Sequence, residues 1–346
     1  MSRRRVILVA GLLVGGTAAA IVARSALLDT TAAPAMTQAA EAWLASLAPE
    51  QVAKARREFA DPRRRDWHFI PKFERKGLVC REMTPAQEAL AFDLLRAAVS
   101  QAGYDKARGI MELDEILRIQ EAEKARNVRD PKRYFFTIFG TPAATGSWGL
   151  SFEGHHLSLN FTVRDGRLVD STPQMFGTNP AIVKTALPGL PPAGHRILRD
   201  EETLAFDLVG SFSPEQRTRA VVAPEAPKDI RGAGEAALPD DPPAGIAWPD
   251  LTARQKELVR AIVDVYCDAM VPEVAEERIR LIESAASGWD AVHVAWAGAT
   301  EPGIGHYYRI EGPTFSIEFC NVQPDAEGTI ANHIHCAWRD RTGDFE

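Results

Sequence analysis

Three segments of this chain occur twice, in the same order and at nearly the same separation. The pairs are SLAPEQ at 46–51 with SFSPEQ at 211–216, GLVCREMTPAQ at 77–87 with GIAWPDLTARQ at 245–255, and SWGLSFEGHHLSLNF at 147–161 with GHYYRIEGPTFSIEF at 305–319. The offsets are 165 (211 − 46), 168 (245 − 77) and 158 (305 − 147). This repetition constrains the fold more than any other feature, because it predicts an internal duplication with units at roughly 44–175 and 209–346.

Each unit predicts helices followed by short strands. Thr84 in one unit and Thr252 in the other stand where an N-cap residue opens a helix, and apolar residues then recur at helical spacing. A further helix is expected over 104–124 and over 272–286. The predicted strands are RYFFTIFG, WGLSFEG, HLSLNFTV and RLVDSTP in the first unit, and AVHVAWAG, HYYRIEG, TFSIEFCN and HIHCAWRD in the second. We therefore expect an α+β fold with two mainly antiparallel sheets, related by a pseudo-two-fold axis.

Domain boundaries follow from the repeats and from local composition. Residues 36–208 are expected to form the first α+β repeat, and 251–346 most of the second. Between them, 209–250 hold the short helix of the second repeat and a connector rich in Pro, Gly and Ala. Such a connector is expected to be mobile in part.

Residues 1–35 are predicted to be an export signal outside the fold. Three arginines at 3–5 precede an apolar run of 18 residues, and the A-x-A pattern that ends at Ala35 suits cleavage there. The segment SRRRVI at 2–7 resembles the twin-arginine pattern. We expect a periplasmic or secreted protein that begins near Met36. An uncleaved N-terminal anchor is the alternative, because 18 apolar residues can barely span a bilayer.

The charge balance argues against nucleic acid as a partner. Lys and Arg number 40 against 47 Asp and Glu, a net charge of −7, whereas phosphate contacts need basic stripes. Membrane contact is expected only through an uncleaved N-terminal segment. The cysteines are expected to be small buried hydrophobic residues rather than disulfides, since Cys320 and Cys336 have opposite strand parity. The four are Cys80, Cys267, Cys320 and Cys336.

Strand side chains alternate between two faces, and here one face is apolar and the other polar. Leu157, Leu159 and Phe161 are expected to point towards the helices. The opposite face carries histidines and small polar groups in place of the usual Lys, Glu and Thr. Its main residues are His156, Ser158, Asn160, Glu318, His333, His335 and Arg339.

His333 and His335 lie on one side of a predicted strand, about 7 Å apart at Cα, a spacing common to metal sites. With a carboxylate such as Glu318 they would suit zinc or iron with open coordination positions. Three interpretations stay open: a metal site, a metal-free polar pocket, or histidines of structural role. From parity and the repeats, we expect both rings to point towards His156 and Glu318 rather than into solvent.

The segments EGHHLSLNFTV, MFGTNPA, YYRIEGPTFSIEF and NHIHCAWRDRTGDF together resemble the bacterial DUF3500 family, whose function is uncharacterised. The resemblance runs over roughly 40–346 and implies no activity. It supports testing one group of residues as a unit, namely His155, His156, His333, His335, Arg339 and Asp340.

Two hypotheses of different classes remain, and the sequence alone does not decide whether the protein is an enzyme. The first is a metal-assisted hydrolase or oxygenase acting on a small molecule, with a divalent zinc or iron ion between the repeats. Its expected residues are His156, His333 and His335 as metal ligands, Glu318 as ligand or general base, Arg339 as catalytic group and anchor for an anionic substrate, and Ser158, Asn160 and Asp340 as further substrate contacts. The second is a non-catalytic periplasmic ligand-binding or assembly protein.

Overall fold

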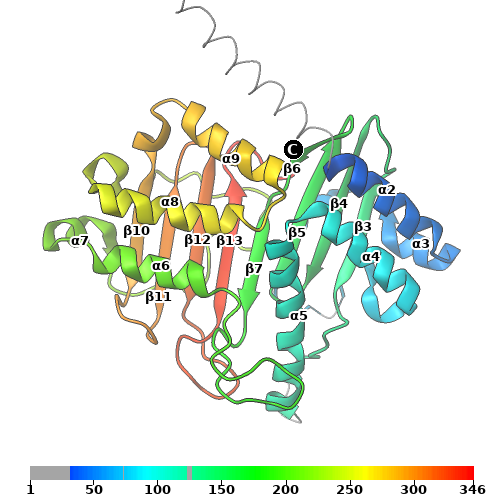
Figure 1. Ribbon diagram of the computed structural model, residues 1–346, viewed down its shortest axis with the longest axis horizontal. Coiled ribbons are helices and arrows are strands. Elements are labelled where there is room, and N and C mark those ends of the chain that lie inside the picture. Colours follow the sequence, from blue (N-terminus) through cyan, green and yellow to red (C-terminus); the bar gives the residue numbers. More distant parts are fainter. Residues whose placement is uncertain (1–31, 73, 123–126) are drawn as a thin grey trace, which may run out of the picture.

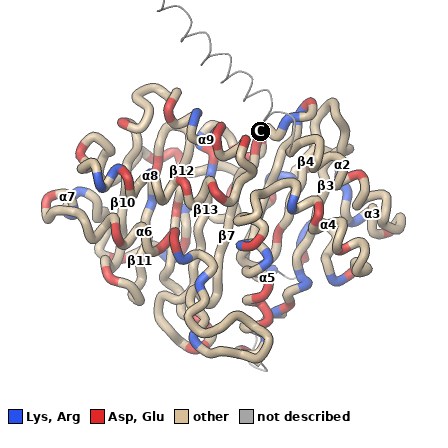
Figure 2. The backbone as a smooth tube through the Cα atoms, viewed as in Figure 1, with Lys and Arg blue, Asp and Glu red and all other residues tan. Residues whose placement is uncertain are grey.

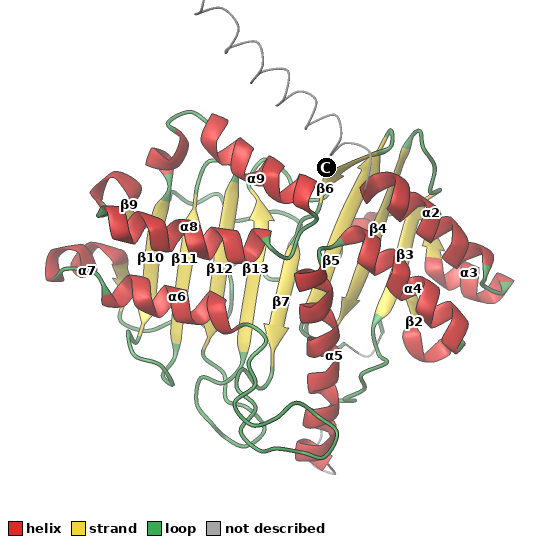
Figure 3. Ribbon diagram, in the orientation of Figure 1, coloured by secondary structure: helices red, strands yellow, loops and turns green. Residues whose placement is uncertain are grey.

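In the computed structural model, residues 32–72, 74–122 and 127–346 are described. Within them, helices cover one face of a single mixed, mostly antiparallel sheet of 13 strands (Figures 1 and 3). The fold class is therefore α+β, as predicted. Most of the apolar core lies between this face of the sheet and the helices.

The first half of the chain contributes four helices and seven strands to the described structure. The helices are α2 (Ala32–Ala45), α3 (Pro49–Ala55), α4 (Pro85–Ala98) and α5 (Gln101–Glu121). The strands are β1 (Arg56–Arg57), β2 (Leu78–Val79), β3 (Phe135–Gly140), β4 (Ser147–Gly154), β5 (Leu157–Arg164), β6 (Arg167–Asp170) and β7 (Gln174–Thr178).

The second half contributes four helices and six strands to the described part of the chain. The helices are α6 (Arg199–Gly210), α7 (Pro214–Ala220), α8 (Ala253–Cys267) and α9 (Pro272–Ser284). The strands are β8 (Val221–Ala223), β9 (Ile246–Ala247), β10 (His293–Gly298), β11 (His306–Glu311), β12 (Phe315–Asn321) and β13 (Ile334–Asp340). All eight predicted strands are confirmed, whereas α2, α6, β7 and the short strands β1, β2, β8 and β9 were not predicted.

The expectation of two separate sheets is wrong. The strand order is β1-β3-β4-β5-β7-β13-β12-β11-β10-β8, so the two halves share one sheet. The join is the antiparallel pair β7–β13, in which Phe176 lies opposite Cys336. Strand β7 was not foreseen, and without it the two sets of strands have no common neighbour. One continuous sheet results because β7 offers its free edge to β13.

The pairing register recurs between the halves with the offsets seen in the sequence. A shift of 158 relates the hairpins β3–β4–β5 to β10–β11–β12. Corresponding pairs are Phe135–Glu153 with His293–Glu311, and Leu150–Phe161 with Tyr308–Phe319. The short strands β1 and β8 are also paired alike in the two halves, since β1 runs parallel to β3 and β8 runs parallel to β10.

Both predicted N-caps are confirmed, and each belongs to a repeated polar arrangement. The Thr84 hydroxyl accepts a hydrogen bond from the Gln87 amide, and Thr252 does the same for Gln255. The two glutamines also bond to the short preceding helices, Gln87 through Gln51 and Gln255 through Gln216. The caps thus start the long helices and tie α3 and α7 to them.

The face of the sheet that was predicted to be polar is buried rather than solvated. Trp67 and Phe69, which precede β2, and Ile230 from the connector form a second apolar cluster with strand residues such as Met175 and Ala337. The connector is therefore packed and not a loose linker. This packing explains why the polar face has so few long, flexible side chains.

The prediction that residues 1–35 lie outside the fold is wrong for residues 32–35, which belong to helix α2. Helix α2 starts at Ala32, and Ala32 and Ala33 are buried. The Ala32 amide also donates a hydrogen bond to Glu273 Oε1 at 3.1 Å. Residues 1–31 lie outside the described residues, so the export signal stays a prediction. Among the described helices, we find none long and apolar enough to cross a bilayer.

The cysteine prediction is confirmed, since all four are buried and free of disulfides. Burial raises the pKa of the Cys80 and Cys267 thiols to about 12, which keeps them protonated. Figure 2 shows Lys and Arg interspersed with Asp and Glu along the described chain.

Candidate metal centre

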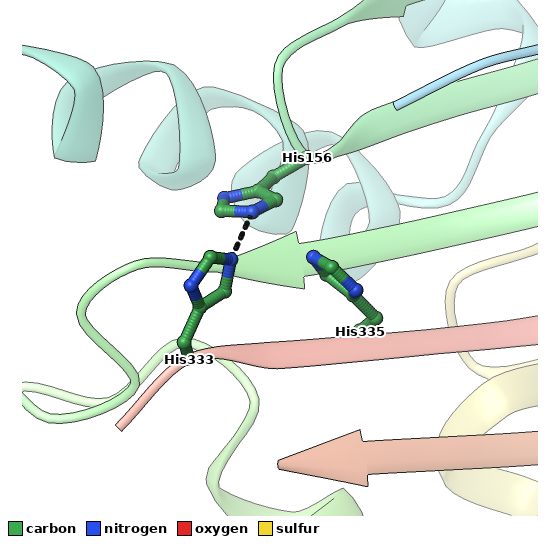
Figure 4. Close-up of side chains that lie close together, drawn as sticks. All are labelled: His156, His333 and His335. Carbon is green, nitrogen blue, oxygen red and sulfur yellow. Dashed lines mark hydrogen bonds between the residues drawn. The ribbon is translucent and has the colours of Figure 1, made fainter. Parts of the chain in front are cut away.

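Three histidines converge at one end of the central strands. His156 comes from the turn between β4 and β5, His333 from the residue before β13, and His335 from β13 itself (Figure 4). One ligand atom from each ring lies within 4.8 Å of the others. The Nε2 atoms of His156 and His333 are 2.7 Å apart. The predicted approach of His156 to the other two histidines is confirmed.

His156 occupies a backbone conformation that histidine rarely adopts. Its φ is +61°, in the second position of the two-residue turn between Gly154 and Leu157. Glycine or asparagine normally occupies such a position, because a Cβ there costs about 1 kcal/mol. This conformation directs the His156 imidazole towards His333. Strand parity had placed His156 on a strand, whereas it lies in the turn. A strained residue in a cluster of ligands points to function.

His335 has the hydrogen-bonding partner that a metal-bound imidazole usually has. Its Nδ1 lies 2.8 Å from Oδ1 of Asp229, a residue of the connector. The carboxylate accepts a hydrogen bond from Nδ1–H, which leaves Nε2 with a free lone pair directed towards the other histidines. The ring of Phe69 meets His335 edge-on, with centroids 4.7 Å apart, and fixes its orientation from the other side.

His333 is held at the polar end of the sheet by two asparagines. Its backbone N–H donates to Asn321 Oδ1 at 2.9 Å, and its Nδ1 lies 3.3 Å from the Asn179 side-chain nitrogen. The Oδ1 of Asn179 is buried without a partner. Rotating that amide by 180° exchanges the two atoms, pairs Oδ1 with an Nδ1 proton of His333 and leaves its Nε2 for a metal.

The electrostatics of the cluster keep the imidazoles of His156 and His333 neutral. Burial holds the pKa of His156 and of His333 well below the usual value, and charge on the neighbouring histidines lowers each pKa further. A neutral imidazole is the form that binds metals. Two ligands at zinc distances near 2.0–2.1 Å and a tetrahedral angle would place their nitrogens about 3.3 Å apart. The 2.7 Å separation of His156 and His333 therefore needs to open by only about 0.6 Å.

His155 supports the cluster from the side. Its ring stacks on His156 with centroids 3.8 Å apart, and its Nδ1 lies 2.7 Å from Asp114 Oδ1 on α5. Tyr134 donates to the other oxygen of Asp114 at 2.9 Å. Arg129 lies near both ring nitrogens of His155, at 3.3 and 3.5 Å. The contacts of His155 with Asp114 and Arg129 hold in place the turn that carries His156.

The structure does not bring Glu318 or Arg339 to the histidines. Glu318 lies on the same face as His335, but its oxygens accept hydrogen bonds from Arg231 and from the Tyr307 hydroxyl, the latter at 2.6 Å. Arg339 is four residues further along β13, about 13 Å away. It pairs there with Asp344 and bonds to backbone carbonyls of the connector.

The remaining predicted substrate contacts are also engaged elsewhere. Ser158 and Asn160 are buried, and Asn160 donates to Ser158 and to the Pro173 carbonyl. Asp340 points to the helix face, where it pairs with Arg278 beside a cleft of about 880 Å³. That cleft is lined by β6, α9 and the C-terminal residues and contains none of the three histidines. The group of residues singled out from the sequence therefore divides between two ends of the sheet.

Comparison with known proteins gives the chain a family. The family described as protein of unknown function (DUF3500) matches residues 29–346. The chain belongs to the DUF3500 family. This confirms the resemblance seen in the segments around His156 and His333. No curated protein and no solved structure matches this DUF3500 protein. The family description carries no activity, so the functional argument rests on the site.

Sequence reasoning missed the partners that surround the ligands in this DUF3500 protein. Asp229 lies in the connector, Asn321 ends β12, and Asp114 lies within α5. Each reaches the site only through tertiary packing. The one available signal was the pair His155–His156 in a tight turn, because a histidine at a turn position suited to glycine suggests a constraint beyond folding.

Proposed function

We propose that this DUF3500 protein is an exported metalloprotein, in which His156, His333 and His335 bind one divalent metal ion that assists a hydrolytic reaction on a small molecule. The observation that carries the proposal is the convergence of three imidazole ligand atoms within 4.8 Å. The hydrogen bond from His335 to Asp229 and the strained turn at His156 support it.

Zinc suits this set of ligands best. Catalytic zinc sites use three protein ligands and leave a fourth position for a water molecule, which the ion acidifies to a pKa near 7. Non-haem iron oxygenases instead use two histidines and one carboxylate. The carboxylate expected for that role, Glu318, is bound by Arg231 and Tyr307. Three imidazoles thus favour hydrolysis over oxygenation.

The proposed ion would lie close to the protein surface at His333 and Asp229. His333 is only partly buried, and the Asp229 side chain keeps 32% of its surface exposed. His156 and His335 are buried, at 4% and 5% exposure. Partial exposure next to two buried ligands suits a water molecule and a small substrate rather than a polymer.

The test begins with metal content. We expect the chain, purified without chelators and reconstituted with zinc, to hold about one ion, and the His335→Ala variant to hold much less. The control is His293→Ala, which removes a half-buried imidazole on β10. Hydrolysis of small esters, phosphate esters and amides is then compared between the two variants. The proposal is overturned if the parent chain binds no metal, or if His335→Ala retains full binding.

The burial of His156 and His335 favours a second candidate, a non-catalytic metal-binding protein in the same compartment. A carrier or store needs ligands but no room for substrate. One ion per chain with no hydrolysis of any of the three substrate classes would select this candidate.

We also infer that the two halves arose by internal duplication and are related by a pseudo-two-fold axis near the β7–β13 pair. The recurring pairing registers support this, as do the repeated caps at Thr84 and Thr252. The registers of β5–β7 and β12–β13 agree with the shift of 158 if the axis passes between Gln174 and Trp338, which lie opposite each other. Superposition of the halves in an experimental structure tests the inference.

Duplication would still leave one metal centre in each chain. With the shift of 158, His155 and His156 correspond to Pro313 and Thr314, which lack metal-binding side chains. Carried through the β5–β7 and β12–β13 registers, the same shift makes Phe176 correspond to Asp340 and His335 to Ser171. The second location is therefore without ligands, and the histidines of the two halves meet at only one of the two pseudo-symmetric locations.

Export through the twin-arginine route remains part of the proposal. Its support is the run of three arginines and the apolar segment in residues 1–31. Replacing Arg3 and Arg4 by Lys is expected to hold the chain in the cytoplasm, as measured by cell fractionation. Unchanged export would indicate the general secretory route instead.

A further inference from the structure

Asn321 occupies a special position at the end of β12. Its backbone lies opposite Ile334, the first residue of β13, so the ladder of strand pairs ends there. His333 lies one residue beyond the ladder. The Asn321 side chain takes over, because its Oδ1 accepts a hydrogen bond from the His333 N–H at 2.9 Å. A side chain thus fixes the backbone of a metal ligand where strand pairing has ended.

The other end of the Asn321 amide is fixed as well. Its Nδ2 donates to Glu202 Oε1 on α6 at 2.8 Å, and Glu202 also pairs with Arg196 at 2.5 Å. His306 Nε2 lies 3.1 Å from the same Glu202 oxygen. Asn321, Glu202 and His306 are at most 7% exposed. These buried side chains therefore connect the His333 backbone to helix α6 on the opposite side of the sheet.

The polar chain, meaning the linked side chains of Asn321, Glu202 and His306, does not recur in the other half of the molecule. The shift of 158 places Val163 at the position of Asn321 and Trp148 at that of His306. Both are buried in the apolar core. The fold therefore forms without the polar chain, since the corresponding strands pair in the same register. The half that carries two of the metal ligands is the half that has it.

We propose that Asn321, anchored by Glu202, is a positioning residue that holds His333 in its ligand geometry and thereby sets the metal affinity of the centre. This inference rests on the proposed metal site and deepens it. The physical reason is the cost of mobility at a ligand. If the His333 backbone moves, its imidazole must be ordered when the ion binds, and that entropy weakens binding.

The experiment measures Co²⁺ binding by its visible spectrum in the full chain and three variants. Asn321→Ser shortens the side chain and breaks both hydrogen bonds. Glu202→Ala removes the anchor, whereas Glu202→Gln keeps an acceptor for Asn321. The matched control is Tyr308→Phe, which removes a buried hydroxyl bonded to the Glu201 carbonyl and does not touch His333.

We expect about a tenfold weaker Co²⁺ affinity and a changed spectrum for Asn321→Ser, a similar loss for Glu202→Ala, and near-parent binding for Glu202→Gln. Tyr308→Phe should lower the unfolding temperature of the metal-free protein but leave affinity and spectrum unchanged. If Asn321→Ser fails to fold, the two Glu202 variants still decide.

Parent-like affinity and spectrum in both Asn321→Ser and Glu202→Ala would overturn the positioning role while leaving the metal centre intact. Absence of Co²⁺ binding by the parent chain would instead overturn the metal centre itself, and this inference with it.

Discussion

The hydrogen bond between Asp229 and His335 gives a sharp test of the proposed centre. Asp229→Asn keeps the size of the side chain and an oxygen that can accept the Nδ1 proton, but it removes the negative charge. In the parent, that charge lies 2.8 Å from the imidazole and makes it a stronger donor to a metal. The substitution therefore isolates the electrostatic part of the interaction.

The expected loss is near the lower end of what such partners contribute. Substituting an outer-shell partner typically weakens metal affinity by about 10- to 100-fold, or about 1.4–2.7 kcal/mol. Asp229 is 32% exposed, so water screens part of its charge. We therefore expect about a tenfold loss. At a zinc concentration of about 100 times the parent Kd, stabilisation by the metal would fall from about 2.7 to about 1.4 kcal/mol.

Two measurements test this expectation. Competition with a coloured chelator gives the zinc Kd directly. Thermal unfolding with and without zinc should show a shift of about 4 °C for the parent and about 2 °C for the variant, given about 1.5 °C per kcal/mol for a domain of this size. Asp241→Asn is the control, because Asp241 lies in the same connector but pairs with Arg231 at 2.7 Å. An unchanged Kd in Asp229→Asn, alongside a large loss in His335→Ala, would refute the proposed role of Asp229.

Three further predictions follow from the same contacts. Both His156→Gly and His156→Ala should lose metal binding. In urea unfolding without metal, the glycine variant should be about 1 kcal/mol more stable than the alanine variant, because only alanine has a Cβ at φ +61°. Equal stabilities of the two variants would argue against a strained turn. The metal-free parent should lose stability as pH falls below about 6.5, because the unfolded chain then binds protons that buried His156 and His333, with their lowered pKa values, do not bind; His333→Gln should flatten this slope, and an identical slope would contradict the assignment. Arg231→Met should lower the free energy of unfolding by about 3 kcal/mol, because Glu311 and Glu318 would lose their buried cation; a loss that persists when both glutamates are also replaced by glutamine would contradict this cause.

Local features of the fold were predictable because they depend on neighbouring residues. The hairpin strands follow from alternation, and the starts of α4 and α8 follow from Thr84 and Thr252. Strand β7 was missed because Pro173 precedes it and Gly177 lies within it, so its five residues show no strand pattern. Helix α2 was missed because its alanine-rich start resembles a cleavage region. Both are short or ambiguous in isolation and become defined only by what they pack against.

The candidate site shows the same division. Parity correctly put His333 and His335 on one face and led to their predicted contact with His156. Parity also put Glu318 and Arg339 on that face, but it says nothing about distance along a strand or about which groups cover the face. Glu318 forms an ion pair with Arg231 from the connector, and Arg339 forms one with Asp344.

The sequence by itself determined the repeated order of helices and strands, the faces of those strands and the identity of the three metal-ligand candidates. These properties arise from periodicity and local capping, which act over a few residues. Only the tertiary structure decided that the halves share one sheet, that the polar face is buried, and that Asp229 and Asn321 support the histidines. Those outcomes depend on contacts between distant segments, such as His335 with Asp229, 106 residues apart, or on which strand edges and strand ends meet. Such contacts form only when burial of apolar surface repays the entropy of bringing distant segments together, and no local pattern records that balance.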